Sequence, residues 1–551
     1  MKVPGCMTTL RSKGAGARRL AFALMLVLAA GAAPGPAAVL AHGPEPIARI
    51  DLEPLGYEGL QAHQLLTGSP MLTVDFVDEQ HVLVTFEVRR LMKREPDALP
   101  GEQDRTVAAC LVEVATGHVL AKTEWRLHDR AQYLWNMGNG RFLLRIRDEL
   151  SVFAPMQHGA EDAFRASPFL VTDRRLIAVL LSADRDLLTV ESVKRPDMST
   201  GEAAANNGPE PNSVQVNFYR IRLDDTGKLV AINAGAIRSR TAVALPITTT
   251  GYLDILEGGK GTWYFNFDEH AGKVKELLAF DTKCMPKPVF VGHSDFVVFG
   301  CKSEDRRIFA GFDLQGEEMW QQGLYDPYIG PTFSFAPAAG RFALGRTLVA
   351  EPMAEDASPE PSFVTGEDVR VFQMHSGRQI FRIDCTPVER AGGNYALAPD
   401  GLELAVVREA EGRRNGDSSS TMTTSQAVVE IYALPPLSVQ DIKDVKAAQA
   451  AAPQDTDARI DQALIRLAKS RHPETGKPAT EHITPAAPAR ESTVTSSAPA
   501  TADQNTSRAK DSPAAAGAAA ASANSSSGDA QPEEPRKPPT LYGPDEKPEH
   551  K

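Results

Sequence analysis

Apolar and polar residues alternate in short runs along most of the chain, from about residue 44 to residue 437. The runs are rich in β-branched and aromatic residues and are bounded by turn residues, which is typical of half-buried β-strands. No amphipathic helical pattern alternates with them, so a parallel α/β fold is excluded. The sequence therefore predicts an all-β domain, and its clearest strands are Val82–Val88, Phe142–Ile146, Val214–Ile221, Phe296–Phe299 and Val369–Phe372.

One phrase recurs along this region: an apolar strand, a turn that ends in glycine, and a second strand. Glycine at this position supplies the positive φ that a tight hairpin needs. The copies lie about 40 to 70 residues apart, which is the spacing of propeller blades with insertions. The turn glycines are Gly117, Gly227, Gly272, Gly316 and Gly377, with a degraded copy around Gly159.

A second phrase precedes the first in several copies and marks a polar turn between two inner strands. It occurs at Asn139–Leu144, Ala339–Leu344 and Ala398–Val406. Together the two phrases define a four-stranded unit with the strand order a, b, c, d. With these repeats the chain resembles the WD40-like, YVTN and quinoprotein-like β-propellers of secreted bacterial proteins. The resemblance implies a fold and no particular activity.

The repeats predict seven blades. Six copies of the outer hairpin are found, and a seventh unit stops after its third strand, Val428–Leu434. The strand-like segment Pro46–Leu52 has no local partner. We predict that it completes the last blade, because pairing there closes the ring and removes two open sheet edges. Eight blades are the alternative, since the second to fourth repeats are less distinct.

Both ends of the chain differ from the propeller region, residues 44–437. A basic segment, the apolar run Leu20–Ala30 and small residues before Ala41 predict an export signal over residues 1–41, with an uncleaved anchor as the alternative. The mature protein would then be periplasmic or extracellular. Residues 438–472 predict a helical linker with one short amphipathic helix at best, and residues 473–551 a disordered tail rich in Pro, Ala and Ser. No second hydrophobic stretch is long enough to cross a membrane.

Charge and cysteine content exclude several protein classes. The net charge of −12 argues against a nucleic-acid-binding protein, which needs a basic surface. Five cysteines in 551 residues do not make a disulfide scaffold. Cys284 and Cys301 flank a predicted hairpin, so we predict that they form a disulfide, with two buried free thiols as the alternative. Cys110 and Cys385 belong to separate blades and are expected to be unpaired core residues.

The sequence predicts no catalytic, metal-binding or cofactor-binding residues, because the common hydrolase, P-loop and metalloprotease motifs are absent from it. His293, within Gly292–Asp295, looks most like a site, although a structural turn explains it as well. Phe312–Trp320 resembles the tryptophan-docking repeats of quinoproteins. Packing between blades explains Trp320 without a cofactor.

Long insertions indicate where a binding surface could lie. All of them fall between strands b and c of their blades and should therefore emerge on one face of the propeller. Such a face is a plausible binding surface for a protein, peptide or glycan, because rigid scaffolds often carry recognition on their loops. Tolerant surface loops are the alternative. The insertions are Lys93–Arg105, Arg195–Asn212, Ala350–Glu367 and Arg408–Gln426.

These features favour an exported, monomeric and non-enzymatic binding or scaffold module. The first alternative is a propeller enzyme, namely a hydrolase, lyase or quinone-dependent oxidoreductase, with polar residues at the mouth of the central channel. The second is an envelope-assembly factor. A cluster of His, Asp, Glu or Arg converging at one end of the channel would favour catalysis.

Overall fold

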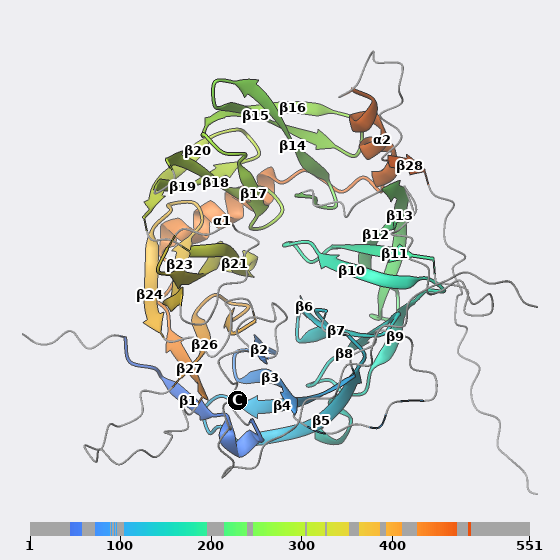
Figure 1. Ribbon diagram of the computed structural model, residues 1–551, viewed down its shortest axis with the longest axis vertical. Coiled ribbons are helices and arrows are strands. Elements are labelled where there is room, and N and C mark those ends of the chain that lie inside the picture. Colours follow the sequence, from blue (N-terminus) through green and yellow to red (C-terminus); the bar gives the residue numbers. More distant parts are fainter. Residues whose placement is uncertain are drawn as a thin grey trace, which may run out of the picture. The chain divides into compact units, whose positions relative to one another are not determined.

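Seven antiparallel β-sheets surround a central axis in the computed structural model of the chain (Figure 1). The structure describes residues 44–57, 72–88, 90, 93, 95, 104–129, 131–194, 214–239, 246–303, 306–325, 328–351, 363–385, 393–409, 427–470 and 483–485. Each sheet is one blade of a propeller, so the predicted all-β, seven-bladed fold is confirmed and the eight-bladed alternative is wrong.

The strands of blades 1, 2, 4, 5 and 6 follow one another in the chain, as the predicted order a to d requires, whereas blades 3 and 7 each also contain one strand from a distant part of the chain. Blades 1 and 2 comprise β2 (Leu72–Phe76), β3 (His81–Val88), β4 (Arg105–Glu113), β5 (Val119–Leu127), β6 (Leu134–Gly138), β7 (Arg141–Ile146), β8 (Glu149–Phe153) and β9 (Ser167–Val171). Blade 3 comprises β10 (Arg175–Leu181), β11 (Leu187–Val193), β12 (Val214–Leu223) and β13 (Leu229–Ser239), to which β28 (Ile483–Pro485) is added as a fifth strand.

Blade 4 has three strands among the described residues, and the later blades have four. Blades 4 and 5 comprise β14 (Gly251–Gly259), β15 (Thr262–Glu269), β16 (Val274–Asp281), β17 (Lys287–Phe290), β18 (Asp295–Ser303), β19 (Arg306–Asp313) and β20 (Glu318–Leu324). Blades 6 and 7 comprise β21 (Tyr328–Ala336), β22 (Arg341–Val349), β23 (Val364–Gln373), β24 (Gln379–Cys385), β25 (Tyr395–Leu397), β26 (Glu403–Glu409), β27 (Ala427–Ala433) and β1 (Ala48–Asp51).

The first strand of the chain completes the last blade, as predicted. β1 pairs with β27 in antiparallel register, from Ala48 opposite Ile431 to Asp51 opposite Val428 (Figure 1). Ile50 and the following Leu52 are buried in a cluster that also contains apolar residues of blades 7 and 1. The ring is therefore closed by backbone pairing and by a shared core.

The predicted turn glycines all lie in the hairpin between the two outer strands of a blade, and each has a positive φ between 62° and 98°. At Gly316 a second constraint applies, because a Cβ would lie 2.1 Å from the carbonyl oxygen of Leu277 in the neighbouring blade. Glycine is thus needed there both for the turn and for the close packing of blades.

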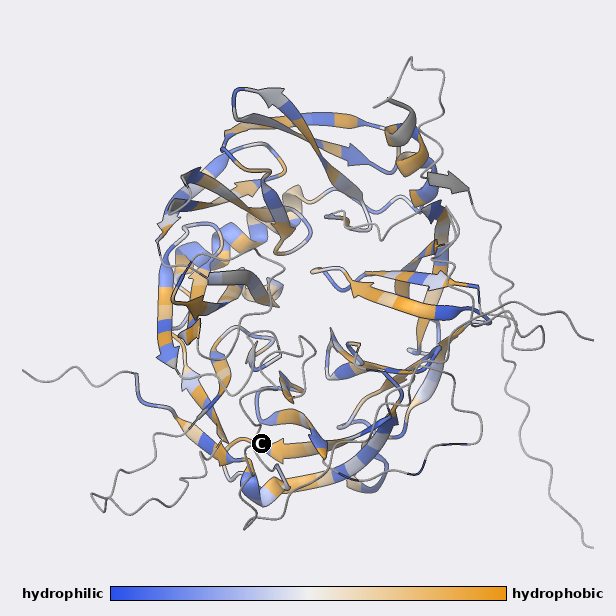
Figure 2. Cartoon of the chain, in the orientation of Figure 1, coloured by the Kyte–Doolittle hydropathy of each residue, from blue (hydrophilic) through white to orange (hydrophobic). Residues whose placement is uncertain are grey.

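Apolar side chains from adjacent blades pack against one another around the ring, and Figure 2 shows the alternation of hydrophobic and hydrophilic residues along the strands. Between blades 5 and 6, Trp320 contacts the rings of Phe309 and Phe372 and its indole N–H donates to the carbonyl oxygen of Met374. Trp320 therefore packs between blades 5 and 6, and this packing accounts for the presence of a tryptophan at this position.

Two helices follow the propeller where the sequence predicted one at best. Helix α1 (Val439–Ala451) begins with a reciprocal capping box between Ser438 and Asp441, a local signal that its weak hydrophobic pattern hides. Helix α2 (Ile460–Ser470) has the predicted helical spacing of apolar residues. Four of its buried residues pack into the cluster between blades 3 and 4, namely Ile460, Ala463, Leu464 and Leu467.

The predicted export signal, residues 1–41, lies outside the described residues. So does the predicted tail, residues 473–551, except for β28. No helix in the described parts of the chain is both long enough and apolar enough to cross a membrane.

Candidate functional site

The four long insertions occupy the predicted position in the topology. Each joins the second and third strands of its blade, between β3 and β4, β11 and β12, β22 and β23, and β26 and β27. Most of their residues lie outside the described ranges. The described residues that suggest a site lie instead on the inner wall of the ring, beside blade 4.

A cavity of about 690 Å³ lies on this wall, within the usual size range of ligand pockets. It is bordered by the inner strands of blades 3 and 5, by β14, and by Phe335 of blade 6. Most of the lining side chains are apolar, and two of them are substantially exposed, Leu180 by 47% and Met285 by 62%. The lining includes Leu180, Leu181, Ala183, Pro246, Ile247, Leu253, Ile255, Met285, Pro286, Pro288, Val289 and Phe290, with Ser182, Thr189 and Lys287 as its polar members.

The predicted disulfide lies at one wall of this cavity. Cys284 is bonded to Cys301, with 5.5 Å between their Cα atoms. The bond links the residue just before Met285 and Pro286 to β18, so it holds this part of the lining to the sheet of blade 5. Cys110 is a buried free thiol, as expected. The side chain of Cys385 lies outside the part of the chain that the structure describes.

The short segment Pro246–Thr250, which contributes two residues to the cavity lining, is held by His270. The backbone N–H of His270 donates to the carbonyl oxygen of Thr250 at 3.0 Å, and its Nε2–H donates to that of Thr248, also at 3.0 Å. Burial lowers the pKa of His270 to about 4, and the positive charges of Arg220 and Arg466 act in the same direction. The neutral imidazole is therefore the form that fits this site.

This histidine should make stability depend on pH. Its folded-state pKa lies below the unfolded value of about 6.5, so the unfolded chain binds more protons between pH 4 and pH 6.5 and stability falls as the pH falls. Urea unfolding at pH 5 and pH 7.5 should show wild type losing about 2 kcal/mol more than His270→Gln, whose amide can still donate to Thr248. Equal losses would contradict this assignment.

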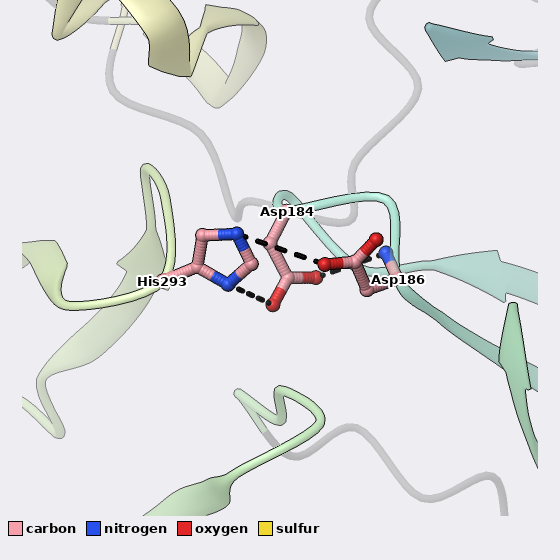
Figure 3. A group of neighbouring side chains, drawn as sticks. All are labelled: Asp184, Asp186 and His293. Carbon is pink, nitrogen blue, oxygen red and sulfur yellow. Dashed lines mark hydrogen bonds and ion pairs between the residues drawn. The ribbon is translucent and has the colours of Figure 1, made fainter. Parts of the chain in front are cut away.

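Asp184, Asp186 and His293 meet at the edge of the cavity (Figure 3). The two aspartates come from the turn between β10 and β11, directly after the lining residue Ala183. His293 comes from the turn between β17 and β18. Its Nδ1 lies 3.2 Å from Asp184 Oδ2 and its Nε2 lies 3.6 Å from Asp186 Oδ2. Turns of blades 3 and 5 thus touch although blade 4 separates them in the chain.

The turn of blade 3 holds Asp184 in place. Asp184 Oδ1 accepts hydrogen bonds from the Ser182 hydroxyl and from the backbone N–H of Asp186, and the carboxylate is fully buried. The guanidinium of Arg185, between the two aspartates in sequence, donates to the carbonyl oxygen of Phe335 at 3.3 Å, and its charge interacts with Asp75. Two negative charges are therefore left facing one imidazole.

The electrostatics of this group follow from that arrangement. The contact with Asp184 raises the pKa of His293, outweighing the opposite effect of burial, and the charge of Asp186 adds to the rise. Burial raises the pKa of Asp186, and the neighbouring charge of Asp184 raises it further. Burial also raises the pKa of Asp75, on β2 of blade 1, to about 7. The hydrogen bond from Asn136 and the positive charge of Arg185 oppose this rise. A cation placed between Asp184 and Asp186 would be stabilised by both carboxylates.

Sequence reasoning found part of this site. His293 was identified as the residue most like a site, and the structure places it in a turn, where it also contacts two carboxylates. Asp184 and Asp186 were missed, because an Asp-Arg-Asp turn is common on protein surfaces and only the fold brings it to His293. The cavity was missed as well, and the breakdown of the strand pattern at Pro246–Thr250 was the one local signal for it.

No protein-family description matches the chain, and no curated protein matches it. Similar solved structures include an uncharacterised protein of Listeria monocytogenes (6% identity over 61% of this chain and 89% of that chain, TM-score 0.31). They also include the acylaminoacyl peptidase of Pyrococcus horikoshii (10% identity over 69% of this chain and 55% of that chain, TM-score 0.33). The Dos1 propeller is a further example (9% identity over 49% of this chain and 63% of that chain, TM-score 0.23). The fold assignment rests on the topology of this chain itself: seven sheets around one axis, closed by the first strand.

Proposed function

We propose that the chain is an exported, non-enzymatic binding propeller of the WD40-like, YVTN and quinoprotein-like class. Its ligand is an apolar segment of a protein or peptide partner, bound in the cavity between the inner strands of blades 3 and 5. The supporting observation is the cavity itself: about 690 Å³ in volume, lined mainly by aliphatic and proline side chains, with Leu180 and Met285 substantially exposed. Large apolar side chains exposed together favour an apolar partner.

The lining favours a peptide segment over a glycan. Sugar hydroxyls need hydrogen-bond partners when they are buried, and the lining residues offer few: Ser182, Thr189 and Lys287. Leucine, valine or phenylalanine side chains need none, and each contributes about 1.5–3 kcal/mol when it leaves water. The proposed site thus lies on the inner wall of the ring, whereas the sequence had suggested the face with the long insertions.

Binding is also better supported than catalysis. Asp184, Asp186 and His293 converge in the way that would favour an enzyme. However, both nitrogens of His293 face carboxylates, so the imidazole is not placed to take a proton from a substrate in the cavity. The lining residues themselves include no pair of acidic or histidine side chains. An envelope-assembly role is compatible with a binding module and stays a prediction.

The test fills the cavity without changing the backbone. Two fluorescein-labelled pentapeptides serve as probes, one with three central leucines and one with three central serines. We expect the leucine peptide to bind wild type with a Kd below about 1 mM. The substitution Leu180→Trp should raise this Kd at least tenfold. The matched control is Ile177→Trp, on the same strand; Ile177 is 42% exposed and is not among the lining residues. It should change affinity less than twofold.

Three results would overturn this function. They are equal binding of the leucine and serine peptides, equal effects of the two tryptophan substitutions, and no peptide binding to wild type. If decanoate binds in a Leu180-dependent way while the peptide does not, the ligand is a lipid-like molecule and the peptide proposal is wrong. Fluorescence anisotropy measures the three peptide cases, and calorimetric titration measures the binding of decanoate. Matching thermal unfolding curves show that both variants are folded.

A further inference from the structure

We propose that Asp184, Asp186 and His293 form a binding site for a divalent metal ion, with Zn²⁺ preferred over Mg²⁺ and Ca²⁺. The site lies at the edge of the cavity, where turns of blades 3 and 5 meet (Figure 3). It stands on these three side chains alone and does not depend on what the cavity binds.

The positions of the donor atoms support a metal site. One ligand atom from each residue can be chosen so that all three lie within 4.8 Å of one another. Ligands of a tetrahedral zinc ion with bonds of 2.0–2.2 Å are separated by about 3.4 Å, so the donor atoms must approach one another by at most about 1.4 Å. His293 can provide this movement, because its side chain is 43% exposed and lies in a turn. Rotation of the ring would direct one nitrogen at both carboxylates.

A buried oxygen points into the site. The side chain of Asp184 is fully buried, and its Oδ2 receives no hydrogen bond from the described residues, since His293 lies within ion-pair distance of it without hydrogen-bond geometry. A buried carboxylate oxygen without a hydrogen-bond donor is costly. With His293 neutral the group has a charge of −2, and with His293 protonated it has −1. A divalent cation compensates the buried oxygen and both carboxylates at once.

The remaining contacts of Asp184 hold it in an orientation suited to a ligand. Its Oδ1 accepts from Ser182 and from the backbone of Asp186, which leaves Oδ2 directed toward His293. Hydrogen bonds of this kind orient carboxylate ligands in metal sites. An imidazole among the ligands favours zinc over magnesium or calcium, and three protein ligands leave at least one coordination position for water or a bound group.

The experiment uses the full chain, treated with a chelator and dialysed, then titrated with ZnCl₂ by calorimetry. We expect one high-affinity ion per chain, and at least tenfold weaker binding in both Asp186→Asn and His293→Gln. These two positions are chosen because both side chains are about two-fifths exposed, so the variants should fold. Titration with Co²⁺ should give d–d absorption bands in wild type that weaken in both variants.

The matched control is His81→Gln. His81 is the first residue of β3, directly after the turn between the two inner strands of blade 1. Its Nδ1 is 2.8 Å from Asp78, but no second carboxylate among the described residues completes a set of three ligands. This variant should bind Zn²⁺ like wild type. No stoichiometric binding to wild type would overturn the proposal, and so would equal binding by the two site variants, because the ion would then be held elsewhere. In either case Asp184, Asp186 and His293 form ion pairs of a protonated imidazole with two carboxylates and do not make a metal site.

Discussion

Replacing Asp368 with asparagine is expected to lower the free energy of unfolding by about 3–5 kcal/mol. Asp368 lies on β23 in the middle of blade 6 and is fully buried. Its carboxylate contacts the guanidinium of Arg346 from β22, and it lies 2.6 Å from Arg370 Nη2 and 3.6 Å from Arg382 Nε. One negative charge therefore faces three positive charges.

The size of the effect follows from the burial of Arg346. Its side chain is also fully buried, and its guanidinium lies over the ring of Tyr328 at 5.0 Å. An arginine cannot lose its proton to relieve the cost of burial, so asparagine at position 368 removes the negative charge that Asp368 places beside this buried guanidinium. Asparagine preserves the shape of the side chain, which separates the loss of charge from the loss of packing.

Urea unfolding of the asparagine variant measures this loss, and Asp384→Asn is the control. Asp384 also pairs with Arg382, at 2.8 Å, but its side chain is 57% exposed. Exposed ion pairs contribute about 0–1 kcal/mol, so the control should stay close to wild type. Similar losses in the two variants would show that the buried ionic cluster of blade 6 does not have the role described here.

The second large effect is expected at the closing strand. The double substitution Ile50→Ala with Leu52→Ala should lower the free energy of unfolding by about 4–10 kcal/mol, since each truncation of a buried Ile or Leu costs about 2–5 kcal/mol. Ile50 is 2% exposed and Leu52 is fully buried, in a cluster shared with blades 7 and 1. The backbone pairing of β1 with β27 is left unchanged, so the experiment isolates the packing part of ring closure.

Asp51→Ala is the matched control for the closing strand. Asp51 lies between the two substituted residues, its side chain is 57% exposed, and it pairs only with the exposed Arg49 among the contacts that the structure gives it. We expect a loss below about 1 kcal/mol for this variant. If the double variant were no less stable than the control, the closing strand would contribute little to the ring. Limited proteolysis near β1 and β27 would give an independent measure.

Much of the fold could be predicted because its signals are local. Glycine is strongly favoured where a tight hairpin takes a positive φ, so Gly227 and Gly377 mark blades without any knowledge of their neighbours. The closing strand was found because Pro46–Leu52 is apolar and has no partner near it in the chain. The capping box of α1 was equally local and was overlooked, because the helix has only a weak apolar face.

The candidate site could not be predicted in the same way. Asp184 and His293 belong to different blades. The sequence singled out His293, but nothing in it distinguishes Asp184 from ordinary turn residues or places the two side chains together. The cavity depends on how the inner strands of blades 3 and 5 are placed around blade 4. Even Leu180, which is exposed beside it, is part of an apolar run that would fit a buried strand equally well.

The sequence by itself determined the repeat, the turns, the closing strand and the pairing of Cys284 with Cys301, because each depends on backbone conformation or on residues close together in one hairpin. Only the tertiary structure decided which turns face one another across the ring and which apolar side chains remain exposed within it. Such contacts join residues distant in the chain, and they are set by the packing of whole blades, which no local pattern encodes.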